Sequence, residues 1–348
     1  MKVRFDLVKA RLRAPFVSSS GAISARELLL LRIVDSQGSV GAGEAAPLAG
    51  YDEATIGDVR DILEDSRPTL MRAHRLDWAE ILAECSRLAE LPPALAAIDL
   101  ALWDLAGRQA GQPVWRLLGA MEALPVSVNA TIGAMDRAGA AAAAAAARAE
   151  GFSCVKVKVG AGDDGGRLAA VRAAVGRDVA IRIDANGVWS VKQAIASLRA
   201  FEPIGIELCE QPVAGVDEIA SVARATNVPI GIDESVAARG ALDKRCCEAV
   251  CLKIVRCGGI SGLIDAARRA RSAGYSVYLA STLDGPLGIA AALHAAAVVR
   301  PDRPSGLGTL TLFEQQPNPI PVSGGFMRVP EGVGLGDGLR AWYGRLSP

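Results

Sequence analysis

Residues 151–160 read GFSCVKVKVG, and this stretch begins the pattern that decides the fold. Valines alternate with Lys156 and Lys158, as in a buried strand, whose successive side chains point to opposite faces. The two lysines therefore share one face of a strand in the interior. Because an ammonium group is costly to bury without a partner, this face must meet compensating charge. The stretch predicts a strand that contributes to a site.

Short β-branched runs of the same kind alternate with alanine-rich helical segments from residue 125 onward. The runs include VAIRIDANG, IGIELCEQP, PIGIDES, AVCLKIVRCGG and SVYLAS, and the segments between them include residues 140–147 and 241–248. About eight strands and seven helices in alternation predict a parallel sheet closed into a TIM-like α/β barrel. We assign residues 124–314 to this barrel.

The residues before the barrel predict a small α+β capping domain, residues 1–123. Residues 3–12 and 27–34 are strand-like, and the polar stretch PFVSSSGAISA between them predicts a loop. The glycine-rich segment 315–348 is expected to pack back on this domain and complete it. We expect the cap loops at 15–21 and 48–52 to set substrate specificity and to order when substrate binds.

Composition favours a small-molecule partner. The chain has 348 residues, 51% of them hydrophobic, and 38 basic residues balance 38 acidic ones. Zero net charge without a basic cluster argues against nucleic acid and acidic membranes. The apolar run at 289–299 is too short to span a bilayer. Whether the chain forms a homo-oligomer is left open.

Cysteine and histidine usage limits the chemistry. No signal peptide precedes the first strand, and seven cysteines, an odd number without paired CxxC motifs, favour free thiols in a reducing cytoplasm. The two histidines, His74 and His294, make a Ser-His-Asp triad or a His-ligated metal improbable. Lysines and carboxylates must then perform any acid–base chemistry.

Five consecutive predicted strands end in a charged residue. They are Lys158, Asp184, Glu210, Asp233 and Lys253. A single charged residue at a strand end is usually a solvated rim residue or a helix cap. Five on the lumen side instead indicate an active site, which parallel barrels place at the carboxyl ends of their strands.

The three carboxylates would repel one another without a cation. Oxygen ligands favour Mg²⁺, with Mn²⁺ as the alternative, so Asp184, Glu210 and Asp233 are the predicted metal ligands. Lys158 and Lys253 would flank a bound carboxylate substrate, with Lys156 as electrostatic support. Metal charge, burial and a second ammonium are expected to lower a lysine pKa toward that of a general base for α-proton removal.

The motifs KVKVG, DANG, EQP, GIDES and LKIVRCGGI, in this order, resemble the enolase superfamily, specifically its muconate-lactonizing-enzyme subgroup. The resemblance covers nearly the whole chain. It implies a (β/α)7β barrel under an α+β cap and metal ligands at Asp184, Glu210 and Asp233. It also implies that Lys158 and Lys253 form the acid–base pair and that Lys156 neutralises the substrate carboxylate.

The resemblance leaves several reactions open. ASTLDGPLGIAAALHAAA and GEAAPLAGYDEAT are similar to o-succinylbenzoate synthases, which implies a lyase of the menaquinone pathway that eliminates water from an enediolate. Dipeptide epimerases carry a D-x-D pair after the last barrel strand, whereas this chain has SGLGTLTLFEQQPNP. The alternatives are a dipeptide or N-acylamino-acid epimerase or racemase, a muconate cycloisomerase, and a non-catalytic metal-binding barrel. The expected substrate contacts are Asn186, Ser281, Thr282, Asp284, Ser19 and Tyr51.

Overall fold

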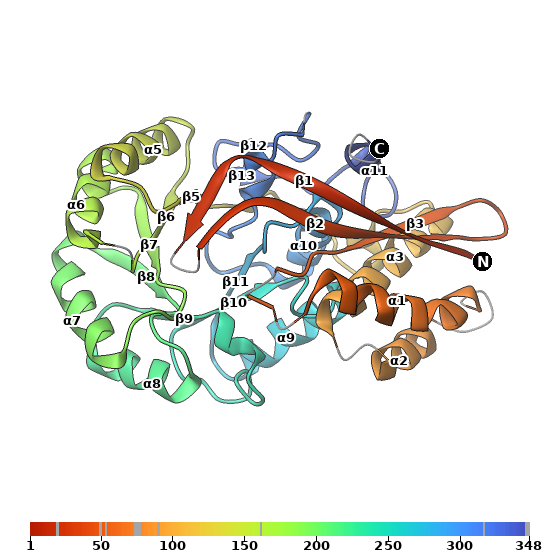
Figure 1. Ribbon diagram of the computed structural model, residues 1–348, viewed down its shortest axis with the longest axis horizontal. Coiled ribbons are helices and arrows are strands. Elements are labelled where there is room, and N and C mark those ends of the chain that lie inside the picture. The colour runs from red at the N-terminus through yellow and green to blue at the C-terminus, as the bar shows by residue number, and fades with distance from the viewer. Residues whose placement is uncertain are drawn as a thin grey trace.

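A computed structural model describes residues 1–18, 21–48, 51–52, 54–72, 78–88, 91–160, 162–315 and 317–344. Figure 1 shows a ring of strands with helices outside it, and beside the ring a second group of strands and helices. The first group is the predicted α/β barrel and the second is the cap. Ser19, an expected substrate contact, lies outside the described residues.

The cap is a three-stranded antiparallel sheet with helices packed on it. Its strands are β1 (Lys2–Ser18), β2 (Gly21–Val34) and β3 (Val40–Ala45), in the order β1-β2-β3. Its helices are α1 (Ile56–Met71), α2 (Trp78–Leu88) and α3 (Pro92–Ala110), followed by the short α4 (Val114–Leu117).

The loop predicted at 15–25 is instead largely strand. After an irregularity between Arg11 and Phe16, the pairing of β1 with β2 resumes and Phe16 faces Ile23. This hairpin extends from the cap to the barrel (Figure 1), where Ala134 N–H donates to the Val17 carbonyl over 3.1 Å. This part of the hairpin was not predicted, because serines and small residues interrupt the alternation of apolar side chains.

Strand β3 packs against α3 with backbone in direct contact. A Cβ atom added at Gly41 would lie 2.3 Å from the Ala101 carbonyl oxygen, and one at Gly43 only 2.1 Å from that of Ala97. Both distances are far inside van der Waals contact, so glycine is required at each position. The GSVGAGEA segment therefore brings Glu44, at the end of β3, into the buried interface with the barrel.

The described part of the barrel contains a parallel seven-stranded sheet in sequential order. Its strands are β5 (Ala130–Ile132), β6 (Cys154–Lys158), β7 (Ala180–Asp184), β8 (Ile206–Glu210), β9 (Ile230–Ile232), β10 (Ala249–Lys253) and β11 (Ser276–Ala280).

Isolated bridges close the ring where an eighth strand was expected. Ser305 bridges to Val128 and Gly306 bridges to Ala280. The Gly306 N–H donates to Leu279 over 2.7 Å, and the Ser305 N–H donates to Ser127 over 2.8 Å. Residues 305–306 thus join β11 to the segment before β5.

Helices connect the barrel strands on the outside. They are α5 (Arg137–Ala149), α6 (Asp164–Val175), α7 (Val191–Phe201), α8 (Val216–Ala225), α9 (Ile260–Ser272) and α10 (Pro286–Val299). The short 3-10 helices are η1 (Glu202–Ile204), η2 (Glu234–Ala237) and η3 (Gly308–Leu312). Between β9 and β10, the helix expected at 241–248 is a turn.

The C-terminal segment contacts both parts of the molecule. Strands β12 (Val322–Ser323) and β13 (Phe326–Met327) extend β4 (Val126–Ser127) at the start of the barrel. Helix α11 (Leu339–Gly344) brings the Tyr343 hydroxyl against Glu44 of the cap, and this hydroxyl also accepts the Leu287 N–H of α10. The tail therefore fastens cap to barrel.

Candidate active site

Five charged side chains meet at the carboxyl end of the barrel strands. Lys158, Asp184, Glu210 and Lys253 are the last residues of β6, β7, β8 and β10, and Asp233 directly follows β9. All five are buried, and the neighbouring Val157, Ile183 and Ile232 belong to the apolar layer between sheet and helices. Strand alternation therefore directs these charges into the lumen.

The buried ammonium groups have carboxylate partners. Lys156 Nζ lies 2.8 Å from Asp184 and 2.5 Å from Glu210, and Lys158 Nζ lies 2.6 Å from Asp184. Across the ring, Lys253 Nζ lies 2.6 Å from Asp233. These ion pairs compensate the cost of burying two lysines on one face of β6.

The carboxylates raise the pKa values of Lys156 and Lys253. Burial disfavours the charged form of Lys156, but Asp184 and Glu210 outweigh burial and raise its pKa well above the ordinary value. Burial also disfavours the charged form of Lys253, but Asp233 together with Glu234 and Glu210 raises its pKa. The nearest charges to both lysines are negative, and the lowering of a lysine pKa expected beside a bound metal ion stays a prediction.

The carboxylates themselves divide into two kinds. Burial would raise the pKa of Asp184 and of Asp233, but nearby lysines outweigh it and hold both pKa values below normal. Burial raises the pKa of Glu210, even though Lys156 opposes the shift. Glu210 also accepts a 2.7 Å hydrogen bond from the Tyr278 hydroxyl.

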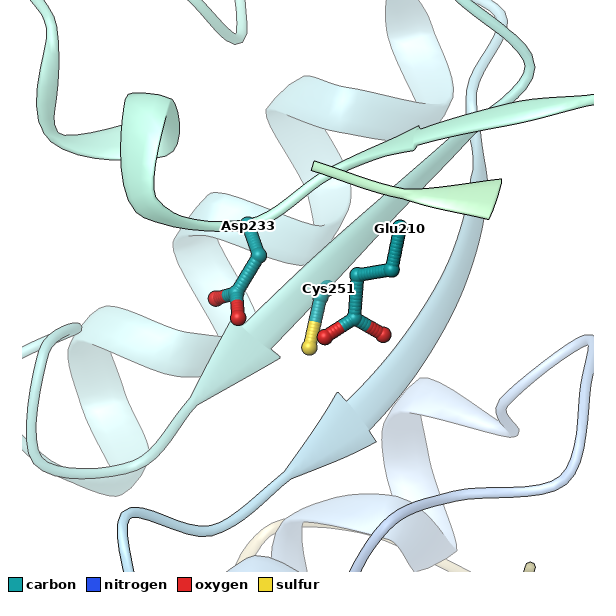
Figure 2. Close-up of side chains that lie close together, drawn as sticks. All are labelled: Glu210, Asp233 and Cys251. Atoms are coloured by element: carbon teal, nitrogen blue, oxygen red, sulfur yellow. The ribbon is translucent and has the colours of Figure 1, made fainter. Parts of the chain in front are cut away.

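The donor atoms suit a hard divalent cation. Oxygens of Glu210 and Asp233 lie, together with Cys251 Sγ, within 4.8 Å of one another, and Figure 2 shows the three side chains converging. Burial raises the pKa of the Cys251 thiol well above normal, and sulfur is a soft donor that Mg²⁺ does not prefer. Asp184 instead faces Lys156 and Lys158. Carboxylate oxygens are the ligands that Mg²⁺ prefers.

Tyr51 extends the cap into this cluster. Its hydroxyl donates to Asp233 over 2.8 Å and also contacts the Lys253 ammonium. The Lys253 Nζ lies 4.4 Å from the centroid of the Tyr51 ring, and the Arg256 guanidinium lies 4.8 Å from it. Arg256 in turn pairs with Asp52 over 3.3 Å. The loop expected to act as a specificity element thus reaches the charged groups.

A pocket opens above the charged cluster. Residues of the β1–β2 hairpin, the Tyr51 loop and the barrel loops line it: Phe16, Gly21, Ala22, Ile23, Leu48, Tyr51, Thr131, Lys156, Lys158, Asp184, Asn186, Lys253, Ala280, Ser281, Thr282, Leu283, Gly306 and Thr309.

Most of the expected substrate contacts lie at this pocket, but Asp284 does not. Asn186 accepts from Lys158 over 2.9 Å, and Ser281 hydrogen-bonds Thr309 over 2.7 Å. Asp284 is fully buried behind the pocket and accepts the Thr282 hydroxyl over 2.7 Å. The interpretation of Asp284 as a substrate contact is corrected accordingly: it stabilises the turn that presents Thr282.

Two residues near the cluster went unrecognised in the sequence. Gln211, with φ of 40°, accepts the Asp233 N–H over 2.8 Å and donates to Ser235 over 2.7 Å. Tyr278 contacts Glu210 from the lumen side of β11. Strand alternation was a signal for Tyr278, which shares the face of Ala280. Nothing in the sequence around Gln211 indicates its role, because that role depends on contact with Asp233 after the neighbouring strand.

The fold is a parallel barrel beneath an α+β cap, and its mouth buries both carboxylates and lysines. This combination is typical of barrel enzymes that use acid–base chemistry. Comparison of the sequence with known protein families supports the same class of enzyme. Residues 2–119 match the mandelate racemase / muconate lactonizing enzyme N-terminal domain, and residues 139–341 match the enolase C-terminal domain-like family. The chain belongs to the enolase superfamily.

Relatives with different reactions align along most of the chain. D-Ala-D/L-Ala epimerase of Cytophaga hutchinsonii is 28% identical over 96% of this chain and 94% of its own. The o-succinylbenzoate synthase of Geobacillus stearothermophilus is 28% identical, covering 94% and 90%. Among solved structures, N-succinyl Arg/Lys racemase of Bacillus cereus superposes with a TM-score of 0.91 at 26% identity, covering 99% and 97%.

These relatives support an epimerase or racemase better than the water-eliminating synthase predicted from sequence. Dipeptide epimerases and the N-succinylamino-acid racemase match more strongly than the synthase does. The Cytophaga epimerase structure, with a TM-score of 0.88, 27% identity and 98% coverage of each chain, is a complex with Mg and a dipeptide. In the described residues, no helix is long and apolar enough to cross a membrane.

Proposed function

We propose that the protein is a metal-dependent racemase or epimerase that inverts the α-carbon of an N-acylated amino acid. The observation that carries this proposal is the placement of Lys158 and Lys253. They end β6 and β10, with β7, β8 and β9 between them in the ring, so they approach the lumen from opposite sides. Inversion needs a base on one face of the α-carbon and an acid on the other.

Each charged residue of the site would have a separate role in the inversion. Lys158 Nζ accepts the α-proton of one enantiomer, while Lys253 Nζ donates a proton to the opposite face. Lys156, between Asp184 and Glu210, keeps its charge and balances the carboxylates. Tyr51, in contact with Asp233 and Lys253, orients this side of the site.

Asp184, Glu210 and Asp233 would hold Mg²⁺, or Mn²⁺ as the alternative. Bound there, the ion would neutralise the charge that develops on the substrate carboxylate. With the ion bound, Asp184 and Asp233 would contact it in place of their lysine partners. This exchange would remove the interactions that raise the pKa of Lys253 and would leave a lysine able to act as a base.

The pocket favours an acylated nitrogen over a free ammonium. Apart from Asp184, no carboxylate occurs among the described lining residues, which otherwise are apolar, carry hydroxyl or amide groups, or are the three lysines. The segment after β11, where the ring closes at 305–306, likewise contributes Gly306 and Thr309 to the lining and no acid. A charged α-amino group would therefore be buried unpaired. The likeness to an N-succinylamino-acid racemase supports the same substrate class.

The shortage of carboxylates in the pocket lining also supports a second candidate reaction, dehydration to o-succinylbenzoate. The precursor of o-succinylbenzoate likewise has no ammonium group. Dehydration requires only Lys158 as base and proton donor to the leaving hydroxyl, with Lys253 remaining a cation. The two candidates therefore differ in whether Lys253 transfers a proton.

Proton NMR in heavy water tests the proposal. The protein is incubated with Mg²⁺ and, separately, N-acetyl and N-succinyl amino acids, dipeptides, muconate and the cyclohexadiene precursor of o-succinylbenzoate. Deuterium entry with inversion of an N-acylamino acid is the expected result. Loss of water from the precursor alone would favour the second candidate, and the absence of α-exchange in every substrate would contradict both.

A further inference from the structure

Two adjacent cysteines lie at the opposite end of the barrel from the lysines. Cys246 and Cys247 belong to the turn that enters β10, and their sulfur atoms lie 3.8 Å apart. Both line one surface cavity, together with Arg245, Glu248 and residues 223–230 around the start of β9. Cys246 is partly exposed there and Cys247 is buried, so a ligand would enter past Cys246.

The separation of the two sulfurs matches bidentate metal binding. A tetrahedral Zn²⁺ holds each thiolate at about 2.3 Å, which places two such sulfurs roughly 3.8 Å apart. A disulfide fits less well, because neighbouring Cα atoms are about 3.8 Å apart whereas disulfides need about 4.4–6.8 Å. One ion bridging the sulfurs therefore requires less rearrangement than a bond between them.

The surroundings help to generate thiolate. The Tyr275 hydroxyl lies 3.3 Å from Cys246 Sγ and accepts the Cys246 N–H over 3.0 Å. Hydrogen bonding from Cys247 and then from Tyr275 outweighs burial and lowers the pKa of Cys246 to about 6. Cys247 keeps its thiol proton, and its Sγ lies 3.4 Å from the Ala249 carbonyl oxygen. This proton would be released when a metal binds.

The guanidinium of Arg245, the residue before Cys246, is already paired with a carboxylate. Arg245 forms an ion pair with Glu248, the next acidic residue along the turn. A cation at the two sulfurs would therefore not meet an unpaired guanidinium from that side chain. Zinc motifs are normally recognised by two cysteines separated by two or more residues, so an adjacent pair does not match such a motif.

We propose that Cys246 and Cys247 form a two-thiolate site for a divalent cation of the zinc class, with water completing its shell. The site is distinct from the carboxylate cluster, which offers hard oxygen donors on the other end of the barrel. The proposal does not depend on the reaction that the lysines perform.

Cadmium titration of the full chain tests this site, since thiolate-to-cadmium charge transfer is visible in the ultraviolet. With excess Mg²⁺ present, the expected result is one equivalent of bound Cd²⁺ with an absorbance that Cys246→Ser and Cys247→Ser each reduce at least tenfold. Cys251→Ala is the matched control, because Cys251 lies beside Glu210 and Asp233. Its absorbance should match the wild type.

Alkylation of the unmodified protein gives an independent readout that no folding defect can obscure. Cd²⁺ should slow the reaction of iodoacetamide with Cys246 at least tenfold, as measured by peptide mass spectrometry. Unchanged alkylation of Cys246, or an absorbance that persists in the double serine variant and disappears in Cys251→Ala, would overturn the proposal.

Discussion

The barrel mouth and the interface between cap and barrel both bury acidic groups, but they give them different partners. At the mouth, Asp184 and Asp233 face lysine ammonium groups. At the interface, Asp99 accepts the Ile260 N–H over 2.6 Å and the Ser261 hydroxyl over 2.6 Å. Asp104 of the cap helix α3 accepts the N–H groups of Ala42 in β3 and Leu335 in the C-terminal segment over 2.9 and 2.8 Å, and it also pairs with Arg108 of its own helix.

The difference lies in whether the partner can leave. A lysine ammonium stands on a flexible four-carbon chain and can be replaced by a cation or a substrate. A backbone N–H cannot move without unfolding the segment that carries it. The interface therefore fixes the positions of cap and barrel, while the mouth can exchange charged partners during a reaction.

The largest expected effect is at the mouth. Lys158→Ala and Lys253→Ala should each reduce inversion by about 1,000-fold or more, since a positioned acid or base contributes roughly 10²–10⁴-fold. α-Proton exchange of the enantiomer facing the remaining lysine should persist. Lys192→Ala, on the exposed side of α7, is the control. If a lysine variant inverted substrate at the wild-type rate, the assignment of the pair would be wrong.

Removing a buried carboxylate away from the barrel mouth should reduce the stability of the fold and leave the catalytic rate unchanged. Asp104→Ala leaves two buried N–H groups without an acceptor and Arg108, 3.0 Å away, without its carboxylate. We expect the free energy of unfolding to fall by roughly 3–5 kcal/mol. Urea denaturation measures this loss, and the exposed Asp265→Ala should change it by less than about 0.5 kcal/mol. Equal free energies of unfolding for the two variants would contradict the role of Asp104 in holding the neighbouring segments in place.

The interface also predicts a pH dependence through His294. Its Nδ1 accepts the Trp115 N–H and its Nε2 lies 3.1 Å from the Leu335 carbonyl, an arrangement that requires neutral imidazole. Burial lowers its pKa from 6.5 to about 4. The contribution of neutral His294 to stability is therefore fully present above pH 6.5, and up to about 3 kcal/mol of it is lost as the pH falls toward 4.

Urea midpoints measured between pH 7.5 and 4.5 check the contribution of His294. The His294→Gln variant should show a shallower fall than the wild type, because it has no proton to bind. Parallel curves for the two proteins would show that His294 does not titrate in this way.

The smallest effect is expected where the cap meets the mouth. Tyr51→Phe removes the hydroxyl that contacts Asp233 and Lys253 but keeps the ring beside the lysine. We expect kcat to fall about tenfold, corresponding to one hydrogen bond of about 1.4 kcal/mol, with KM changed less. Steady-state kinetics measure both constants. A larger change in KM than in kcat would instead indicate that Tyr51 mainly binds substrate.

Sequence reasoning worked best where one strand contained the whole signal. The alternation in VKVKVG and the acidic end of IRIDANG predicted the lumen-facing positions of Lys158 and Asp184 without knowledge of any other strand. The hairpin beyond Phe16, the Gln211 contact to Asp233 and the burial of Asp284 could not be predicted in the same way. Each depends on pairing between distant segments, which local periodicity does not encode.

The arrangement of β6 and β10 within one hydrogen-bonded ring has a consequence for how such proteins diverge. The span between Lys158 and Lys253 is set by the three strands between them, and no cap loop contributes to it. Insertions or substitutions in the β1–β2 hairpin or the Tyr51 loop can therefore reshape the pocket while leaving that span unchanged. Changes in the cap can therefore alter which substrates fit while the spacing of the two lysines stays the same.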